Sequence, residues 1–358
     1  MKYIGNKQRL LDFIDEIVQK EKLPQKGTFV DIFTGTTSVA QHYKKKGYRI
    51  IANDFMTYSY VFQQAYIKNN QFPEFKNLLY SKYFNINSSL SNKYEPLKVV
   101  IDHLNRLPGK KGFIFRHYAP AGEFKRQFFS NENAMRIDAV REQINTWKQE
   151  GLLSESEFYV LLASLIDAAD FVANISGTYG AYLKIWRSMA LKPFTMLVPN
   201  LIESNLGHEV YQEDANELIS RLGADILYID PPYNTRQYAA NFHILETLAC
   251  WDNPKIYGKT GLRPYENQKS LYSQRTKCKE VFVDLINKAK ANYILMSYNN
   301  EGIIPHEFIL GTLGKKGEVK FYTKDYRRFR TEKDNENRHY KVSNDKVTEI
   351  IYYVKTKH

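Results

Sequence analysis

Cysteine and long apolar runs are scarce in this 358-residue chain, and each shortage excludes a class of protein. The two cysteines, Cys250 and Cys278, form no CxxC pair and no cluster with metal-ligand spacing, so the sequence predicts neither a disulfide framework nor a metal site. Mean hydropathy is -0.51, and the most apolar stretch, residues 158–173, is interrupted by Asp167 and Asp170. This pattern argues against a membrane span, and the opening MKYIGNKQRL lacks the apolar segment of a signal peptide. We therefore expect a soluble, cytoplasmic protein.

Acidic residues are outnumbered by basic ones. The chain has 51 Lys and Arg against 39 Asp and Glu, which gives a formal net charge of +12 and an isoelectric point near 9.3. A surplus of this size favours a polyanionic partner, most simply nucleic acid. The charge alone fits a soluble protein that is merely basic equally well, so it indicates a class of partner without establishing one.

Both ends of the chain show alternating strand and helix patterns. The patterns predict a helix over 7–20, a strand over 28–33, a helix ending near 46 and a strand over 48–53. Further along they predict strands over 208–212, 225–229 and 292–298, helices over 215–221, 239–251 and 277–290, and a hairpin of strands 317–323 and 347–354. Strand, helix and strand in succession form a βαβ unit, which requires a parallel sheet.

The middle of the chain, from about residue 70 to residue 205, breaks this rhythm. Residues 108–129 mix Gly, Pro, basic and aromatic residues and are predicted to be mostly loop. Two helices are predicted near 131–150 and 154–173, the second opened by the capping run SESE, and residues 174–186 are again interrupted by glycine. We therefore predict an α/β domain formed by residues 1–69 and 206–358, with residues 70–205 as an inserted, mainly helical region.

The segment ILYIDPPYNTRQY, residues 226–238, ends a strand in an unusual way. Pro231 and Pro232 donate no backbone hydrogen bond and have a fixed φ, so Asp230 and Tyr233 are held in place beside them. Taken alone, such a segment fits a strand terminator at a surface turn as well as it fits a binding site. Its companions at other strand ends favour a binding site, because ligands of open parallel sheets bind at the carboxyl ends of the strands.

Those companions are Asp31 and Gly35 after the first strand and Asp54 after the second. A carboxylate after the second strand suits a ribose diol, although Asp54 alone is more often a helix cap or a loop residue. The first turn lacks G-x-G-x-x-G, which disfavours a dinucleotide and hence a nicotinamide-dependent oxidoreductase. A nucleoside cofactor without phosphates fits better. Asp214 either contacts an amine of such a cofactor or caps the helix predicted at 215–221.

The blocks YIGNK (3–7), DIFTGTTSVA (31–40), ANDF (52–55) and DPPY (230–233), in this order, resemble the D12 class of DNA N6-adenine methyltransferases, to which Dam enzymes belong. NISGTYGAYLKIW, GKTGLRPYE and YRRFR are more specifically similar to the group of the FokI modification methyltransferase. The resemblance implies a Rossmann-like class I methyltransferase sheet, with residues 70–205 as the target-recognition region. It also implies S-adenosylmethionine as cofactor, S-adenosylhomocysteine as product, and no metal.

The resemblance assigns roles to matching residues. Those that match cofactor-binding positions are Tyr3, Lys7, Asp31, Phe33, Gly35, Thr36, Asp54, Asp214 and Asp230, and the catalytic tetrapeptide is Asp230, Pro231, Pro232 and Tyr233. Without this resemblance, Tyr3 and Lys7 would be interpreted as part of a frayed terminus. One position departs from the family, because Thr37 stands where F-x-G-x-G has its second glycine.

The implied reaction is methyl transfer to an adenine that has been flipped out of the duplex. Asp230 and the carbonyl of Pro231 would each accept a hydrogen bond from N6, and Tyr233 would stack on the base. A cytosine-C5 enzyme needs a nucleophilic cysteine after a proline, and neither cysteine has that context. RNA or cytosine-N4 methylation, or a catalytically silent DNA-binding protein of the same fold, are the remaining alternatives.

Double-stranded DNA is the expected partner, and a restriction–modification system is the expected setting. A cognate restriction endonuclease or a second methyltransferase would act on the same site without a stable complex, and we expect a monomer. The candidate DNA contacts are Lys110, Lys111, Arg116, Tyr118, Lys125, Arg126, Tyr179, Lys184, Arg327 and Arg328. A solvated loop around 108–129 and an exposed charged hairpin around 326–330 are the plainer alternatives.

Overall fold

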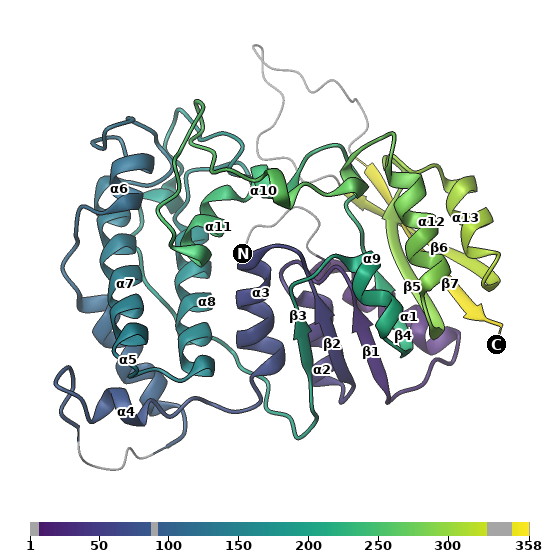
Figure 1. Ribbon diagram of the computed structural model, residues 1–358, viewed down its shortest axis with the longest axis horizontal. Coiled ribbons are helices and arrows are strands. Elements are labelled where there is room, and N and C mark those ends of the chain that lie inside the picture. The colour runs from purple at the N-terminus through teal and green to yellow at the C-terminus, as the bar shows by residue number, and fades with distance from the viewer. Residues whose placement is uncertain (1–6, 87–91, 328–345, 358) are drawn as a thin grey trace. The chain divides into compact units, whose positions relative to one another are not determined.

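The computed structural model describes residues 7–86, 92–327 and 346–357 (Figure 1). These residues form two compact units, each assembled from segments that are far apart in the sequence. The helical unit contains the described residues of 56–210 and 239–266. The sheet unit contains those of 7–55, 211–238 and 267–357. No helix among the described residues is both long enough and apolar enough to cross a bilayer.

Among the described residues, seven strands form one sheet, and all of them except residues 209–210 belong to the sheet unit. They are β1 (Thr28–Asp31), β2 (Arg49–Asn53), β3 (Glu209–Tyr211), β4 (Ala224–Ile229), β5 (Ala291–Asn299), β6 (Gly317–Arg327) and β7 (Lys346–Thr356), and their order is β3-β2-β1-β4-β5-β7-β6. β1 pairs in parallel with β2 and β4, and β4 pairs in parallel with β5. β7 is antiparallel to both β5 and β6, as the predicted hairpin requires. The predicted Rossmann-like α/β fold is confirmed.

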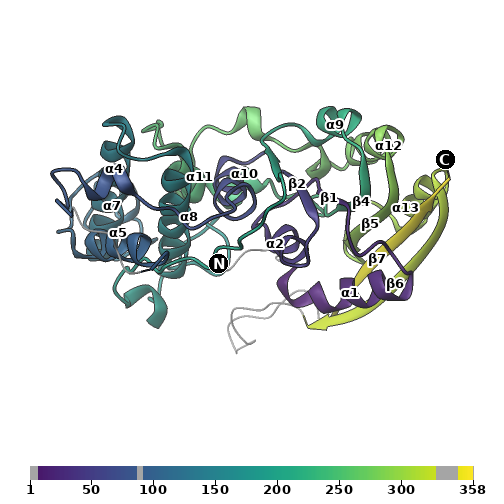
Figure 2. The same cartoon turned by 90° about the horizontal axis from the view of Figure 1, so that it is seen from below.

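Helices cover both faces of this sheet (Figure 2). They are α1 (Leu11–Lys20), α2 (Ser38–Lys45), α9 (Ala215–Leu218), α12 (Cys278–Lys288) and α13 (His306–Leu313). Side chains alternate between the two faces along each strand. Val30 of β1 and Leu227 of β4 join α9, α12 and α13 in the apolar core on one face. Phe29 points the other way and stacks on Tyr43 of α2, with ring centroids 4.1 Å apart.

The same alternation places two carboxylates. Asp31 stands two residues after Phe29, and Asp230 stands two residues after Tyr228, whose ring packs 6.2 Å from that of Phe29. Asp31 and Tyr228 are register partners in the β1–β4 pair. Asp31, Tyr228 and Asp230 therefore belong to the α2 face of the sheet, at the carboxyl ends of its two central parallel strands.

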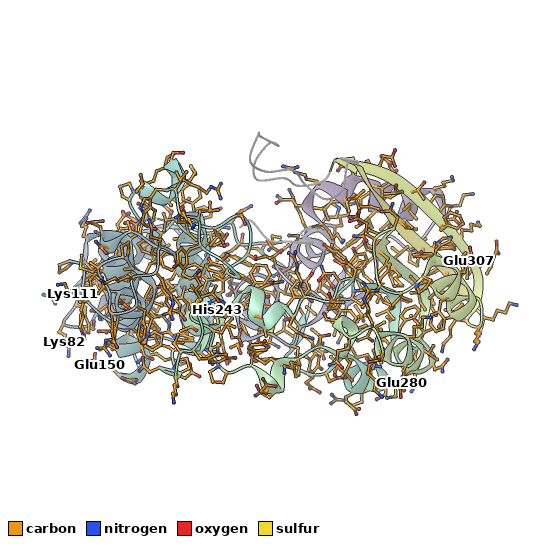
Figure 3. All side chains as sticks on the ribbon, turned by 90° about the horizontal axis from the view of Figure 1, so that it is seen from above. Lys82, Lys111, Glu150, His243, Glu280 and Glu307 are labelled. Atoms are coloured by element: carbon orange, nitrogen blue, oxygen red, sulfur yellow. The ribbon has the colours of Figure 1, made fainter. Side chains whose placement is uncertain are left out.

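The helical unit contains α3 (Thr57–Phe62), α4 (Lys76–Leu79), α5 (Glu95–Arg106), α6 (Phe113–Tyr118), α7 (Asn131–Gln149), α8 (Glu155–Phe171) and α11 (His243–Cys250), and α10 (Tyr238–Asn241) leads into it. α8 begins as the sequence predicts, because Ser154 and Glu157 form a reciprocal capping box. Figure 3 shows His243 inside this unit and Lys111 at its surface.

The prediction that residues 108–129 are mostly loop is confirmed, and one short helix, α6, lies within them. The N-terminus of α6 is capped by Asp138 of α7, whose carboxylate accepts hydrogen bonds from the backbone N–H groups of Gly112, Ile114 and Phe115 at 3.0, 2.8 and 2.8 Å. A cap supplied from 20 or more residues away satisfies the free N–H groups of a helix start but leaves no local signal.

The compact units also divide the chain at different residues from the predicted domains. Residues 56–69 and 239–266 pack with the helices rather than with the sheet. Buried Glu246 of α11 explains part of this grouping, because its carboxylate accepts hydrogen bonds from the backbone N–H groups of Thr57 and Tyr58 at the start of α3. The functional division at 70–205 stays a prediction.

Candidate active site

The central strands β1 and β4 create a switch point at their carboxyl ends. From β1 the sheet continues to β2, and from β4 it continues to β5 in the opposite direction. Ligands of open α/β sheets bind in the crevice that this reversal leaves. Asp31 is the last residue of β1, and Asp230 directly follows β4. The structure therefore brings two of the predicted site residues to the same sheet edge.

A lysine ammonium lies between two carboxylates at this edge. Lys7 Nζ is 3.2 Å from Asp230 Oδ1 and 3.7 Å from Glu349 Oε2. All three side chains are largely buried, with exposed fractions of 5% for Lys7, 16% for Asp230 and 13% for Glu349. Lys7 immediately precedes a 3-10 turn, Gln8–Leu10, that leads into α1, so it is an ordered part of the site and not a frayed end.

Burial and charge set the protonation of this group. Burial raises the pKa of Asp230 to about 6, against the ammonium of Lys7, which lowers it. Burial disfavours the charged form of Lys7, but the carboxylates of Asp230 and Glu349 outweigh it and raise the pKa of Lys7. Asp230 is thus ionised at neutral pH and becomes protonated as the pH falls through about 6.

Asp31 is the most buried carboxyl group of the site. It is 1% exposed, and its Oδ1 has no hydrogen-bond partner among the described residues. Burial, together with the charges of Asp230 and Asp54, raises the pKa of Asp31 well above its ordinary value. A buried acceptor without a donor points to a missing ligand or water. Beside Asp31 Oδ1, a positively charged hydrogen-bond donor would be stabilised more than a neutral one.

The turn after β1 is shaped by two residues with positive φ. Gly35 has a φ of +55° and donates its backbone N–H to Asp54 Oδ2 at 2.8 Å. Thr37 has a φ of +64° and is fully buried. The left-handed region favours glycine and strains a β-branched side chain by roughly 1–3 kcal/mol. Glycine at this position in the family therefore fits the backbone that Thr37 adopts here.

The other predicted cofactor residues lie in the same unit. The ring of Phe33 meets Tyr272 edge-on at 5.1 Å, and Thr36 Oγ1 is 3.1 Å from Ser38 Oγ. Asp214 caps α9, because its Oδ1 accepts the backbone N–H of Asn216 at 2.8 Å and that of Glu217 at 3.3 Å. The capping alternative for Asp214 is confirmed. Tyr3 lies outside the described residues.

The proline pair holds the chain close to the sheet edge. Pro231 is buried, while Pro232 and Tyr233 are half-buried. Tyr233 is fixed from two sides: its carbonyl accepts the backbone N–H of Ile303 at 3.0 Å, and its ring centroid is 5.9 Å from Lys7 Nζ. The tetrapeptide therefore presents a partly exposed ring beside the Asp230 carboxylate.

Three of the candidate DNA contacts are buried within the helical unit, and assigning them to a DNA surface was wrong. Tyr118 donates its hydroxyl to Gly261 O at 2.9 Å, and Tyr179 donates to Asp170 Oδ1 at 3.1 Å. Both rings are fully buried. Arg126 is 5% exposed and donates to three backbone carbonyls. For Tyr118 and Arg126, which lie in residues 108–129, the plainer alternative to a DNA contact is therefore correct. Their side chains hold the segment in place.

The other candidates of the helical unit remain at its surface. Lys111, Arg116, Lys125 and Lys184 are exposed, and Lys110 is exposed but forms an ion pair with Glu142. Arg327 is the last residue of β6, and its side chain lies outside the described set, as does all of Arg328.

Two residues were missed from the sequence. Glu349 is the one charged residue in the buried run Val347–Val354, and that break in an apolar pattern was the available signal. Phe124 is 42% exposed, yet its ring stacks on His117 at 5.0 Å and lies 4.8 Å from the guanidinium of Arg126. An exposed aromatic ring held on both sides gives no local sequence signal, because its support is tertiary.

Comparison with known proteins agrees with this geometry. The family of D12 class N6 adenine-specific DNA methyltransferases matches residues 3–307. The type II methyltransferase M.FokI of Planomicrobium okeanokoites is 40% identical over 357 residues, 99% of this chain and 52% of that protein. M.NlaIII of Neisseria lactamica is 39% identical over 347 residues, 96% of each chain. The modification methylase StsI of Streptococcus sanguinis is 35% identical over 360 residues, 100% of this chain and 52% of that protein.

The chain therefore spans about half the length of two of these relatives and nearly the whole of the third. The matched region includes the turn after β1, Asp54 and the tetrapeptide after β4. This protein belongs to the D12 class of N6 adenine-specific DNA methyltransferases.

Proposed function

We propose that this protein transfers the methyl group of S-adenosylmethionine to N6 of a flipped-out adenine at a specific site in double-stranded DNA. The carboxylate of Asp230, held by the proline pair at the switch point beside buried Asp31, is the observation that carries the proposal. Membership of the D12 class implies both the cofactor and a DNA substrate. The names of the relatives, which are type II and modification methyltransferases, support a role as the modification enzyme beside a restriction endonuclease.

The charge of the site suits the cofactor. Among the described residues, Asp230 and Glu349 flank the ammonium of Lys7, and the carboxyl group of Asp31 lies near Asp230 and Asp54. S-adenosylmethionine brings a sulfonium and an α-ammonium, both cationic, and the unpartnered Asp31 Oδ1 is a fitting acceptor for such a donor. Asp54, which already fixes Gly35, is placed after β2 where a ribose diol is bound in this fold class.

In the proposed reaction, Asp230 acts as a hydrogen-bond acceptor that reorients the amine of adenine. The N6 lone pair of adenine is delocalised into the ring, so it must be redirected before it can attack. Asp230 and the carbonyl of Pro231 each accept one N6–H bond, which draws the nitrogen toward tetrahedral geometry. A bond then forms between N6 and the methyl carbon, the S–CH3 bond breaks with its electron pair left on sulfur, and N6 releases a proton to Asp230 or to water. Positioning and preorganised charge supply the catalysis.

The proposed DNA contacts are the exposed members of the basic set, Lys110, Lys111, Arg116, Lys125 and Lys184. Phe124 adds a partly exposed ring that can wedge between base pairs. Tyr233 remains the proposed platform for the flipped adenine.

One assay tests the proposed function directly. Duplex DNA is incubated with methyl-labelled S-adenosylmethionine and the protein, digested to nucleosides and separated. We expect the label in N6-methyl-2′-deoxyadenosine and none in cytosine nucleosides. Label in cytosine, or transfer only to RNA, would contradict the proposal. Sequencing of the methylated DNA then identifies the recognition site.

Replacing Asp54 with alanine is expected to raise the Kd for S-adenosylhomocysteine roughly 10- to 100-fold, because two effects add. The variant loses a charged acceptor for the ribose, and it releases the N–H of Gly35 that fixes the turn. Isothermal titration calorimetry measures the Kd. Glu280→Gln removes a carboxylate that is 71% exposed on α12 and serves as the control with unchanged affinity. An unaltered Kd for the Asp54 variant would remove Asp54 from the cofactor site.

A further inference from the structure

Strand β7 carries one charged side chain where packing favours an apolar one. Val347, Ile351 and Tyr353 alternate on the same face as Glu349, and all three are buried. Glu349 is also largely buried, and its Oε2 accepts no hydrogen bond from the described residues. A buried carboxylate of this kind is unfavourable unless a cation lies beside it. Packing therefore gives no reason for Glu349.

The cation beside it is Lys7, which also pairs with Asp230. The two distances, 3.7 Å to Glu349 and 3.2 Å to Asp230, place one ammonium between two carboxylates. β7 is fixed at this point, because Asn300 donates its backbone N–H to Thr348 O at 3.1 Å and accepts the backbone N–H of Thr348 at 3.2 Å. The arrangement joins residues 342 positions apart and is held by the sheet.

We propose that Glu349 is a positioning residue that shares the Lys7 ammonium with Asp230, and thereby keeps Asp230 a strong acceptor for the amine of adenine. The proposal rests on the proposed function of Asp230. If Lys7 paired with Asp230 alone, its ammonium would satisfy that carboxylate and compete with the N6–H donor. With two carboxylates to one ammonium, Asp230 keeps unsatisfied negative charge to offer the substrate.

The charged groups around Asp230 predict opposite shifts for two variants. Lys7 lowers the pKa of Asp230, and Glu349 raises it. Asp31, Tyr228 and Tyr233 also interact with Asp230 and stay unchanged in both variants. Glu349→Gln should therefore lower the pKa of Asp230, and Lys7→Met should raise it, each by on the order of one pH unit.

Two readouts test this. The first is an NMR titration of protein with 13C-carboxyl-labelled aspartate, in which Asp230→Asn assigns the Asp230 resonance. The second is the pH dependence of kcat for methyl transfer, whose acid limb should lie near pH 6 in the unaltered protein and shift downward in Glu349→Gln. Glu318→Gln, which alters a carboxylate that is 70% exposed on the same hairpin, should leave both readouts unchanged.

A third variant serves as the control for an effect on folding. Glu349→Leu fits the apolar pattern of β7 and is expected to keep or raise Tm while giving the same downward pKa shift. If the pKa of Asp230 measured from its resonance is unchanged or higher in Glu349→Gln, the proposal is overturned. Because the titration needs no turnover, it separates this failure from failure of the proposed function, which would show as no label in adenine with the unaltered protein.

Discussion

Replacing Asp230 with asparagine is expected to lower kcat for methyl transfer roughly 10²- to 10³-fold while the fold is kept. Asparagine has the same shape as aspartate but carries no charge, and one of its two terminal atoms donates instead of accepting. In the variant, the terminal NH2 group faces either the N6 amine, whose hydrogen it cannot accept, or Lys7. In the second case the variant loses the contact between Lys7 Nζ and Oδ1, which are 3.2 Å apart in the unaltered protein. A 10³-fold loss corresponds to about 4 kcal/mol of transition-state stabilisation.

The measurement is a single-turnover assay with labelled S-adenosylmethionine at saturating DNA, which separates chemistry from binding. DNA affinity is expected to stay within about threefold of the unaltered protein, since removing a group that acts in the transition state changes kcat and leaves ground-state binding in place. Asp230→Ala tests the same residue without the new donor, and its Tm shows whether Lys7 remains accommodated. Equal transfer by either variant would remove Asp230 from the mechanism.

Replacing Arg126 with alanine is expected to destabilise the protein by about 3 kcal/mol. The guanidinium donates from Nε to Lys259 O at 3.0 Å, from Nη2 to Gly258 O at 2.9 Å and from Nη1 to His117 O at 2.9 Å. It is 5% exposed, so water does not replace these bonds in the variant without rearrangement. Three carbonyls then lose their donor, and the segment at 258–261 keeps the Tyr118 hydroxyl bond to Gly261 O as a link to the end of α6.

Arg116 provides a matched comparison within the same segment. It is exposed on α6, so Arg116→Ala is expected to change stability by less than about 0.5 kcal/mol. If it contacts a phosphate, its loss reduces the slope of log K against log salt concentration by about 1. Urea unfolding and DNA binding at several salt concentrations measure both effects. An Arg126→Ala protein as stable as the unaltered one would contradict its structural role.

The site could be predicted from the sequence where its signals are local. The strand ending in Asp230, the acidic residues after β1 and β2, and the order of these blocks identified the fold class and the family. Strand periodicity and helix caps such as Ser154 depend on neighbours a few residues away, so they are visible in one dimension.

The roles of polar side chains were less predictable, because burial depends on the rest of the fold. Arg126 and Arg116 lie ten residues apart in one basic, aromatic stretch, yet Arg126 is buried and binds backbone carbonyls whereas Arg116 faces solvent. Tyr179 was predicted to contact DNA and instead pairs with Asp170. Residue type and spacing alone do not distinguish these cases.

The sequence by itself therefore determined the fold class, the family and the proposed site residues at the strand ends, since each depends on a short-range pattern. Only the tertiary structure decided that Asp138 caps α6, that Arg126 is structural, and that Glu349 meets Lys7 at Asp230. The physical reason is that a buried charge is stabilised by its partners, and a parallel sheet brings those partners from segments hundreds of residues apart.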